Sequence, residues 1–175
     1  MLRKTSHSIS TLVMSFMLVC LTTFGANADD IPQPTGEPIL TVTGALSNTN
    51  SDGIAIIDLE MLKNLPRSEF STSTLWTDEV NTFAGVSLVD LVEFLGVTGT
   101  TFSAIAINDY AVEIPVSDAV EGGPIIAYLM DGEELSARDK GPLWILYPFD
   151  NNEDYRNEQI YSRSIWQLDR IEIFE

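Results

Sequence analysis

The side chains most able to bind a ligand gather in the C-terminal part of the chain. Arg138, Lys140 and Arg163 are the candidate cations, and Trp144 and Trp166 are the candidate stacking groups. Aromatic rings stack on planar groups, and ammonium or guanidinium groups hold anions by charge-assisted hydrogen bonds. We therefore predict that these five residues form a pocket for a small planar or anionic ligand. The alternative is that the tryptophans pack in the core and the arginines pair with the abundant carboxylates.

Two residue types that carry much of enzyme chemistry occur only near the N-terminus. His7 is the single histidine and Cys20 the single cysteine. The sequence after them therefore offers no disulfide, thiolate nucleophile or imidazole base. Zinc, copper and haem sites of the usual kinds need Cys or His ligands, and a Ser-His-Asp triad needs a histidine. Remaining chemistry would rest on carboxylates, Tyr, Lys, Arg or a bound cofactor.

The first residues have the form of a secretory signal. Arg3 and Lys4 precede an apolar run over residues 9–24, and Ala26-Asn27-Ala28 has the small-x-small form of a cleavage site. We predict that residues 1–28 are a signal peptide and that the protein is periplasmic or secreted. An uncleaved membrane anchor is the alternative, but the apolar run is short for a full span. We therefore expect no membrane insertion after cleavage.

The predicted mature chain is strongly acidic. All 26 acidic residues follow position 28, whereas Arg3 and Lys4 are two of the nine basic residues, so 26 acids face seven bases and the net charge is −19. Such a surface repels phosphate backbones, so we expect no nucleic-acid partner. The plain function of this charge is solubility outside the cytoplasm.

The chain after the signal suits one domain. Residues 29–38 hold three prolines and a glycine and predict an extended lead-in, which leaves residues 39–175 as the domain. Residues 88–95 predict a helix with one apolar face, begun by the N-cap Ser87 and ended by Gly96. A shorter helix is expected over residues 59–65, capped by Asp58.

Alternation of apolar and polar residues predicts more strands than helices. The expected β segments are residues 39–44, 54–57, 69–75, 102–107, 110–116, 125–130, 143–147, 165–168 and 170–174. Residues 150–161 are polar and predict a loop. Because no regular strand–helix–strand rhythm occurs, the pattern predicts an α+β or mainly β domain with mixed sheets.

Three further patterns each have a functional and a structural interpretation. Asp109-Tyr110 could act as an acid–base pair, or simply form a hairpin turn. The spacing Asp150-x-Asn152-x-Asp154 resembles the start of a calcium loop, or is a solvated acidic segment. The segment 138–142 (RDKGP) either turns two cations toward the pocket or is a charged turn set by Gly-Pro.

Four segments in order resemble the molybdopterin-binding domain of the sulfite-oxidase-like oxidoreductases. They are FAGVSLVDLVEFLGV (83–97), AINDYAVEIPVSDA (106–119), IIAYLMDGEELSARDKGPLWILYP (125–148) and SRSIWQLDRIEI (162–173). The resemblance covers residues 39–174, nearly all of the predicted mature chain. It implies an α+β fold with mixed, partly barrel-like β-sheets and a few short helices.

The sequence departs from this family at the metal ligand. Family enzymes bind molybdenum through one cysteine thiolate, which by motif order would fall near Thr74, Leu75 or Trp76. An apolar or aryl side chain cannot replace a soft sulfur ligand. Two basic positions of the family pattern are also changed, because tryptophan stands at both, Trp144 and Trp166.

Fold does not by itself fix function, and two functions stay open. The first is a non-enzymatic module with no cofactor, which binds a small ligand or an extracytoplasmic partner protein. The second is an oxidoreductase that holds molybdopterin without a protein thiolate and acts on a small, for example sulfur-containing, substrate. We expect the first, because the fold signature is present while the metal ligand is missing.

Overall fold

Alternating burial along the chain produces the first of two β-sheets. In β1 (Pro38–Gly44), Leu40 and Val42 are buried while their neighbours are more accessible. The computed structural model describes residues 31–175, so the predicted signal peptide, residues 1–28, lies outside the described residues. The first sheet has the order β2 (Ala55–Asp58), β1, β10 (Leu168–Phe174), β5 (Thr101–Ala106), β6 (Ala111–Pro115).

The second sheet is built on two neighbouring strands buried deeply in the molecule. Its strands are β3 (Arg67–Thr72), β4 (Asn81–Ser87), β7 (Ile125–Met130) and β8 (Glu133–Glu134), and β9 (Trp144–Leu146) also pairs with β7. Within residues 31–175, β1 and β10 are the one pair of strands that runs parallel, so the first sheet is mixed. Both strand orders are open paths, and neither sheet closes into a barrel within residues 31–175. The expected α+β class is therefore confirmed.

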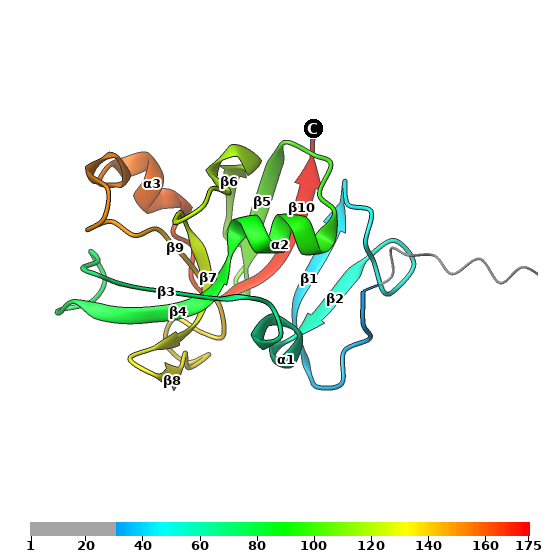
Figure 1. Ribbon diagram of the computed structural model, residues 1–175, viewed down its shortest axis with the longest axis horizontal. Helices are drawn as coiled ribbons and strands as arrows, with labels where there is room; N and C mark the ends of the chain where they lie inside the picture. The colour runs from blue at the N-terminus through cyan, green and yellow to red at the C-terminus, as the bar shows by residue number, and fades with distance from the viewer. Residues whose placement is uncertain (1–30) are drawn as a thin grey trace, which may run out of the picture.

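The helices are short, and all of those described except η1 begin at a side-chain cap. They are α1 (Leu59–Lys63), α2 (Leu88–Leu95), α3 (Glu158–Arg163) and the 3₁₀ turns η1 (Val116–Asp118) and η2 (Glu153–Tyr155). Figure 1 shows α2 crossing in front of the strands, with α3 at one end of the molecule and α1 near its lower edge. None of the helices in residues 31–175 has the length and apolar character needed to cross a bilayer.

The helix α2 follows the sequence prediction closely. The Ser87 hydroxyl accepts the Asp90 N–H at 3.0 Å, and Gly96 ends the helix with a left-handed φ of 58°. Its Leu88, Leu91 and Leu95 side chains are buried. The capped ends and the single apolar face together explain why the bounds 88–95 are confirmed.

Two expectations near the C-terminus are wrong. Residues 150–161 contain η2 and α3 rather than a loop only, because Asn157 caps α3 through the Ile160 N–H at 3.0 Å. The helix buries only Ile160, so it leaves no apolar period in the sequence. Residues 165–168 do not form a strand, because Gln167 has a φ of 52° and breaks the extended run before β10.

Candidate functional site

The loop between β3 and β4 places one indole at the centre of an aromatic cluster. The Trp76 ring lies 5.9 Å from Trp144 and 5.6 Å from Trp166, measured between ring centroids. It also lies 6.2 Å from Tyr161 and 6.4 Å from Phe149. The pairs with Trp144, Trp166 and Tyr161 are edge-to-face and the pair with Phe149 is tilted. Edge-to-face pairs at these distances are favourable beyond the area they bury. Trp76 therefore joins β9, α3 and the segment before β10 into one cluster.

A single carboxylate ties this loop to the connection between β9 and α3. Asp150 accepts the Ser73 N–H at 2.6 Å, the Ser73 hydroxyl at 2.8 Å and the Arg156 guanidinium at 2.8 Å. The Asp150 N–H in turn donates to the Thr72 hydroxyl at 3.1 Å. The backbone hydrogen bond from Ser73, followed by the side-chain bonds, lowers the pKa of Asp150. The start of the loop is thus fixed at a position that brings Trp76 to the cluster.

A pocket of about 440 Å³ opens beside the cluster. Four aromatic side chains line it: Trp76, Tyr110, Tyr161 and Trp166. Tyr110 is 55% exposed and Trp166 is 38% exposed, so the pocket opens to the surface at these two rings. The volume lies in the range of small-molecule sites, which are mostly apolar with a few polar groups.

The polar side chains of the lining are mostly engaged in the fold. The Gln167 amide donates to the Ala137 and Asp139 carbonyls, both at 3.1 Å, and the Ser164 hydroxyl donates to the Ile160 carbonyl at 3.2 Å. Glu158 is the one charged side chain in the lining, among the residues that the structure describes. The pocket is therefore aromatic, weakly polar and negative.

The two predicted tryptophans have different environments. Trp166 lines the pocket, as just described, whereas Trp144 is fully buried in β9. Trp144 packs edge-to-face against Phe83 at 5.5 Å and donates its indole N–H to the Ser164 carbonyl at 3.2 Å. The two rings lie 6.3 Å apart, so Trp144 supports the pocket wall from behind without lining it.

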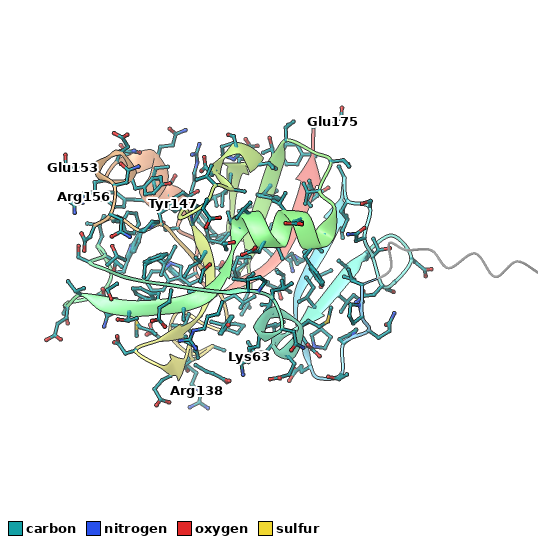
Figure 2. The ribbon with its side chains drawn as sticks, viewed as in Figure 1. Lys63, Arg138, Tyr147, Glu153, Arg156 and Glu175 are labelled. Atoms are coloured by element: carbon teal, nitrogen blue, oxygen red, sulfur yellow. The ribbon has the colours of Figure 1, made fainter. Side chains whose placement is uncertain are left out.

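The three predicted cations do not line the pocket. Lys140 pairs with Asp139 at 3.1 Å and lies 5.8 Å from the centroid of the Trp144 ring. Arg138 is exposed on the connection between β8 and β9, and Figure 2 shows it at the edge of the molecule away from Arg156. Of the five residues predicted together, the structure brings only Trp166 into the pocket lining.

Arg163 is held in a separate polar network. Its guanidinium donates to Asp118 at 2.8 Å, and the Tyr147 hydroxyl donates to the same carboxylate oxygen at 2.6 Å. Burial, and then the hydrogen bond to Asp118, raise the pKa of Tyr147, so its hydroxyl stays a proton donor. This network joins η1, the residue that follows β9, and α3.

The other patterns in the sequence have structural partners. Asp109 has a φ of 64° in the turn between β5 and β6 and pairs with Arg170. Asp150 is engaged by Ser73, and Asn152 caps η2. No group of three Asp, Glu, His or Cys side chains that could hold a metal ion occurs within residues 31–175.

The residues around the pocket do not fit a molybdenum pterin. That cofactor needs a soft ligand for the metal and cations or N–H groups for its phosphate. Trp76 is one of the three residues near which the resemblance puts the thiolate, and none of the three is a soft ligand. The charged lining residue is Glu158 rather than a lysine or arginine. A carboxylate beside a phosphate would be repulsive, so the donor set opposes this group.

Comparison with known proteins gives the fold but not the family. No family model and no curated protein sequence matches the chain. Among solved structures, the sulfane dehydrogenase SoxCD from Paracoccus pantotrophus matches with a TM-score of 0.59 and 15% sequence identity. The match covers 82% of this chain but only 40% of the SoxCD chain. The chain thus has, as a distant likeness, a molybdopterin-oxidoreductase-like fold.

Proposed function

We propose that this protein is an exported, non-catalytic binding module that uses a molybdopterin-oxidoreductase-like fold to bind a small planar ligand. The observation that carries the proposal is the position of Trp76. Trp76 is one of the three residues near which the resemblance places the metal ligand, and it lines a pocket of about 440 Å³. An aromatic lining residue in a segment without a soft ligand supports binding rather than metal chemistry.

The composition of the pocket supports binding over catalysis. The Ser162 hydroxyl donates to the Gln159 carbonyl at 2.7 Å, and Ser164 is used in the same way by the Ile160 carbonyl. A serine nucleophile needs a neighbouring base that takes its proton, and these hydroxyls point their protons at backbone carbonyls instead. Aromatic walls with a few oriented polar groups are typical of recognition sites.

Metal and pterin analysis tests the proposal. The full chain is produced with its leader in molybdenum-replete cells and recovered from the periplasm, and a molybdopterin enzyme is expressed in parallel as the positive control. We expect less than about 5% molybdenum occupancy and no pterin fluorescence after acid release. Stoichiometric molybdenum would overturn the proposal. N-terminal sequencing of the same sample checks export, with Asp29 expected as the first residue.

A second candidate function is favoured by the fold likeness to a sulfane dehydrogenase. In that case the protein is an oxidoreductase that holds molybdopterin without a protein thiolate and acts on a small sulfur compound. It requires pterin in the purified protein and reduction of an artificial electron acceptor by thiosulfate or sulfite. Absence of both, in a preparation where the control enzyme is loaded and active, excludes it.

A further inference from the structure

The charge of the pocket restricts the ligands that it can bind. Its four aromatic side chains come from separate segments: Trp76 from the β3–β4 loop, Tyr110 from the β5–β6 turn, Tyr161 from α3, and Trp166 from the segment before β10. Each ring carries negative charge on its faces and attracts cations there. A pocket walled by four such rings favours a positive guest over a negative one.

The charged groups around the pocket reinforce this preference. Glu158, an exposed residue of α3, is the one charged residue of the lining among residues 31–175. Arg163 lies two residues after Tyr161 in α3, and its guanidinium forms an ion pair with Asp118 at 2.8 Å. Lys140 is matched by Asp139 at 3.1 Å and lies over Trp144, behind the wall. The chain as a whole has a net charge of −17, so the long-range field also attracts cations and repels anions.

We infer that the pocket binds a small organic cation, one whose positive charge is spread over an aromatic or quaternary ammonium group. Such a cation loses little hydration on entry, gains cation–π attraction from the rings, and is balanced by Glu158. An inorganic cation would lose its hydration shell without gaining enough oxygen ligands. The inference rests on the proposed function, because it names the ligand class of the same pocket.

Three probes of similar size and different charge test the inference. They are phenyltrimethylammonium, N,N-dimethylaniline at a pH where it is uncharged, and benzenesulfonate. Binding to the full mature protein is measured by isothermal titration calorimetry and by the change in tryptophan emission. We expect the cation to bind about tenfold more tightly than the neutral probe. We expect no measurable binding of the anion.

Three variants locate the effect, with Glu153→Gln as the matched control for Glu158→Gln. Glu158→Gln should weaken binding of phenyltrimethylammonium about threefold to fivefold and leave N,N-dimethylaniline unchanged. Glu153→Gln makes an equal charge change at an exposed residue of η2 outside the pocket lining. It should leave the affinities for both probes unchanged. Trp166→Leu keeps an apolar wall but removes the ring. It should therefore weaken binding of the cation more than binding of the neutral probe.

The outcomes separate the inference from the proposed function. If none of the three probes binds while circular dichroism shows a folded protein, the pocket is not a small-molecule site and both fail. If the neutral or anionic probe binds as tightly as the cation, the pocket binds ligands but the organic-cation inference is overturned. If Glu153→Gln weakens binding of phenyltrimethylammonium as much as Glu158→Gln does, the preference for the cation comes from net charge. The assignment of cation binding to this pocket is then wrong.

Discussion

Two regions of this molecule, around α2 and around the pocket, are built in different ways. Around α2, a regular helix buries Leu88, Leu91 and Leu95, and its ends are fixed by Ser87 and Gly96. Around the pocket, the β3–β4 loop, β9 and α3 meet through aromatic pairs and side-chain hydrogen bonds to the backbone. Figure 1 shows the contrast, with α2 over the middle of the strands and α3 beside irregular connections at one end.

The difference teaches which part is scaffold and which part is site. A helix with a periodic apolar face buries apolar area but presents few kinds of exposed side chain. The region around α2 can therefore stabilise the fold and offers few binding groups. Irregular connections can present rings and polar groups at several angles, and binding residues are often carried in this way on a rigid framework. Trp144 belongs to the framework and Trp166 to the site, although the two rings lie only 6.3 Å apart.

The largest expected effect of the variants considered is at Trp144. Replacing Trp144 by alanine removes a fully buried ring that contacts Phe83, Trp76 and Trp166. We expect the free energy of unfolding to fall by about 3–5 kcal/mol, measured by urea denaturation. Trp144→Phe, which keeps most of the packing, serves as the comparison and should lose clearly less. A loss below about 1 kcal/mol for the alanine variant would show that this ring is not part of the framework.

The polar network at α3 should give the next largest effect. Asp118→Ala leaves the Tyr147 hydroxyl and the Arg163 guanidinium without their shared acceptor. The side chains of Arg163 and Asp118 are both mostly buried, so water replaces this acceptor poorly. We expect a loss of about 1–3 kcal/mol in urea denaturation. Asp118→Asn keeps an oxygen for the tyrosine and should lose less. Equal losses for the two variants would contradict the role given to this shared oxygen.

Loss of the N-cap of α2 should lower the free energy of unfolding less than loss of a core ring does. Ser87→Ala removes the acceptor of the Asp90 N–H and should lower the free energy of unfolding by about 1 kcal/mol. Ser87→Thr keeps a hydroxyl at the cap and is the matched control. If Ser87→Ala lowered the free energy of unfolding as much as Trp144→Ala does, the comparison between the α2 region and the pocket region would be contradicted.

Trp166 should affect binding more than folding. Because its ring is 38% exposed at the pocket mouth, Trp166→Ala should cost less than half of what Trp144→Ala costs in the same urea experiment. Binding of phenyltrimethylammonium should be reduced at least about threefold. If Trp166→Ala unfolds the protein as readily as Trp144→Ala, Trp166 belongs to the framework and the distinction between the two tryptophans fails.

The smallest expected effect is the pH dependence contributed by Asp150. Hydrogen bonds from Ser73 lower the pKa of Asp150 in the folded protein below the value near 3.9 of an ordinary Asp. Its stabilising contribution is therefore complete above about pH 4 and is lost as the pH falls through the lower folded value. The unfolding free energy of wild type minus that of Asp150→Asn should shrink over this acid range. A difference that stays constant with pH would contradict the assignment.

The sequence alone determined the features that depend on neighbouring residues. The bounds of α2 follow from its cap, its apolar spacing and Gly96, and the turn at Asp109 joins β5 and β6 as predicted. The α+β class follows from the same local patterns. The lack of a thiolate near Thr74 is a plain matter of composition. These features are local because backbone hydrogen bonds and side-chain periodicity are set within a few residues.

Only the tertiary structure decided which side chains meet at the pocket. The sequence placed the missing ligand near Thr74, Leu75 or Trp76 without choosing among them, and the contact of Trp76 with Tyr161 depends on Asp150 holding the loop. The prediction joined Arg163 to the tryptophans because they are near in sequence, whereas Asp118 from a distant segment holds it instead. The side of a short strand or turn that is covered depends on distant segments packed against it, and no local pattern records them.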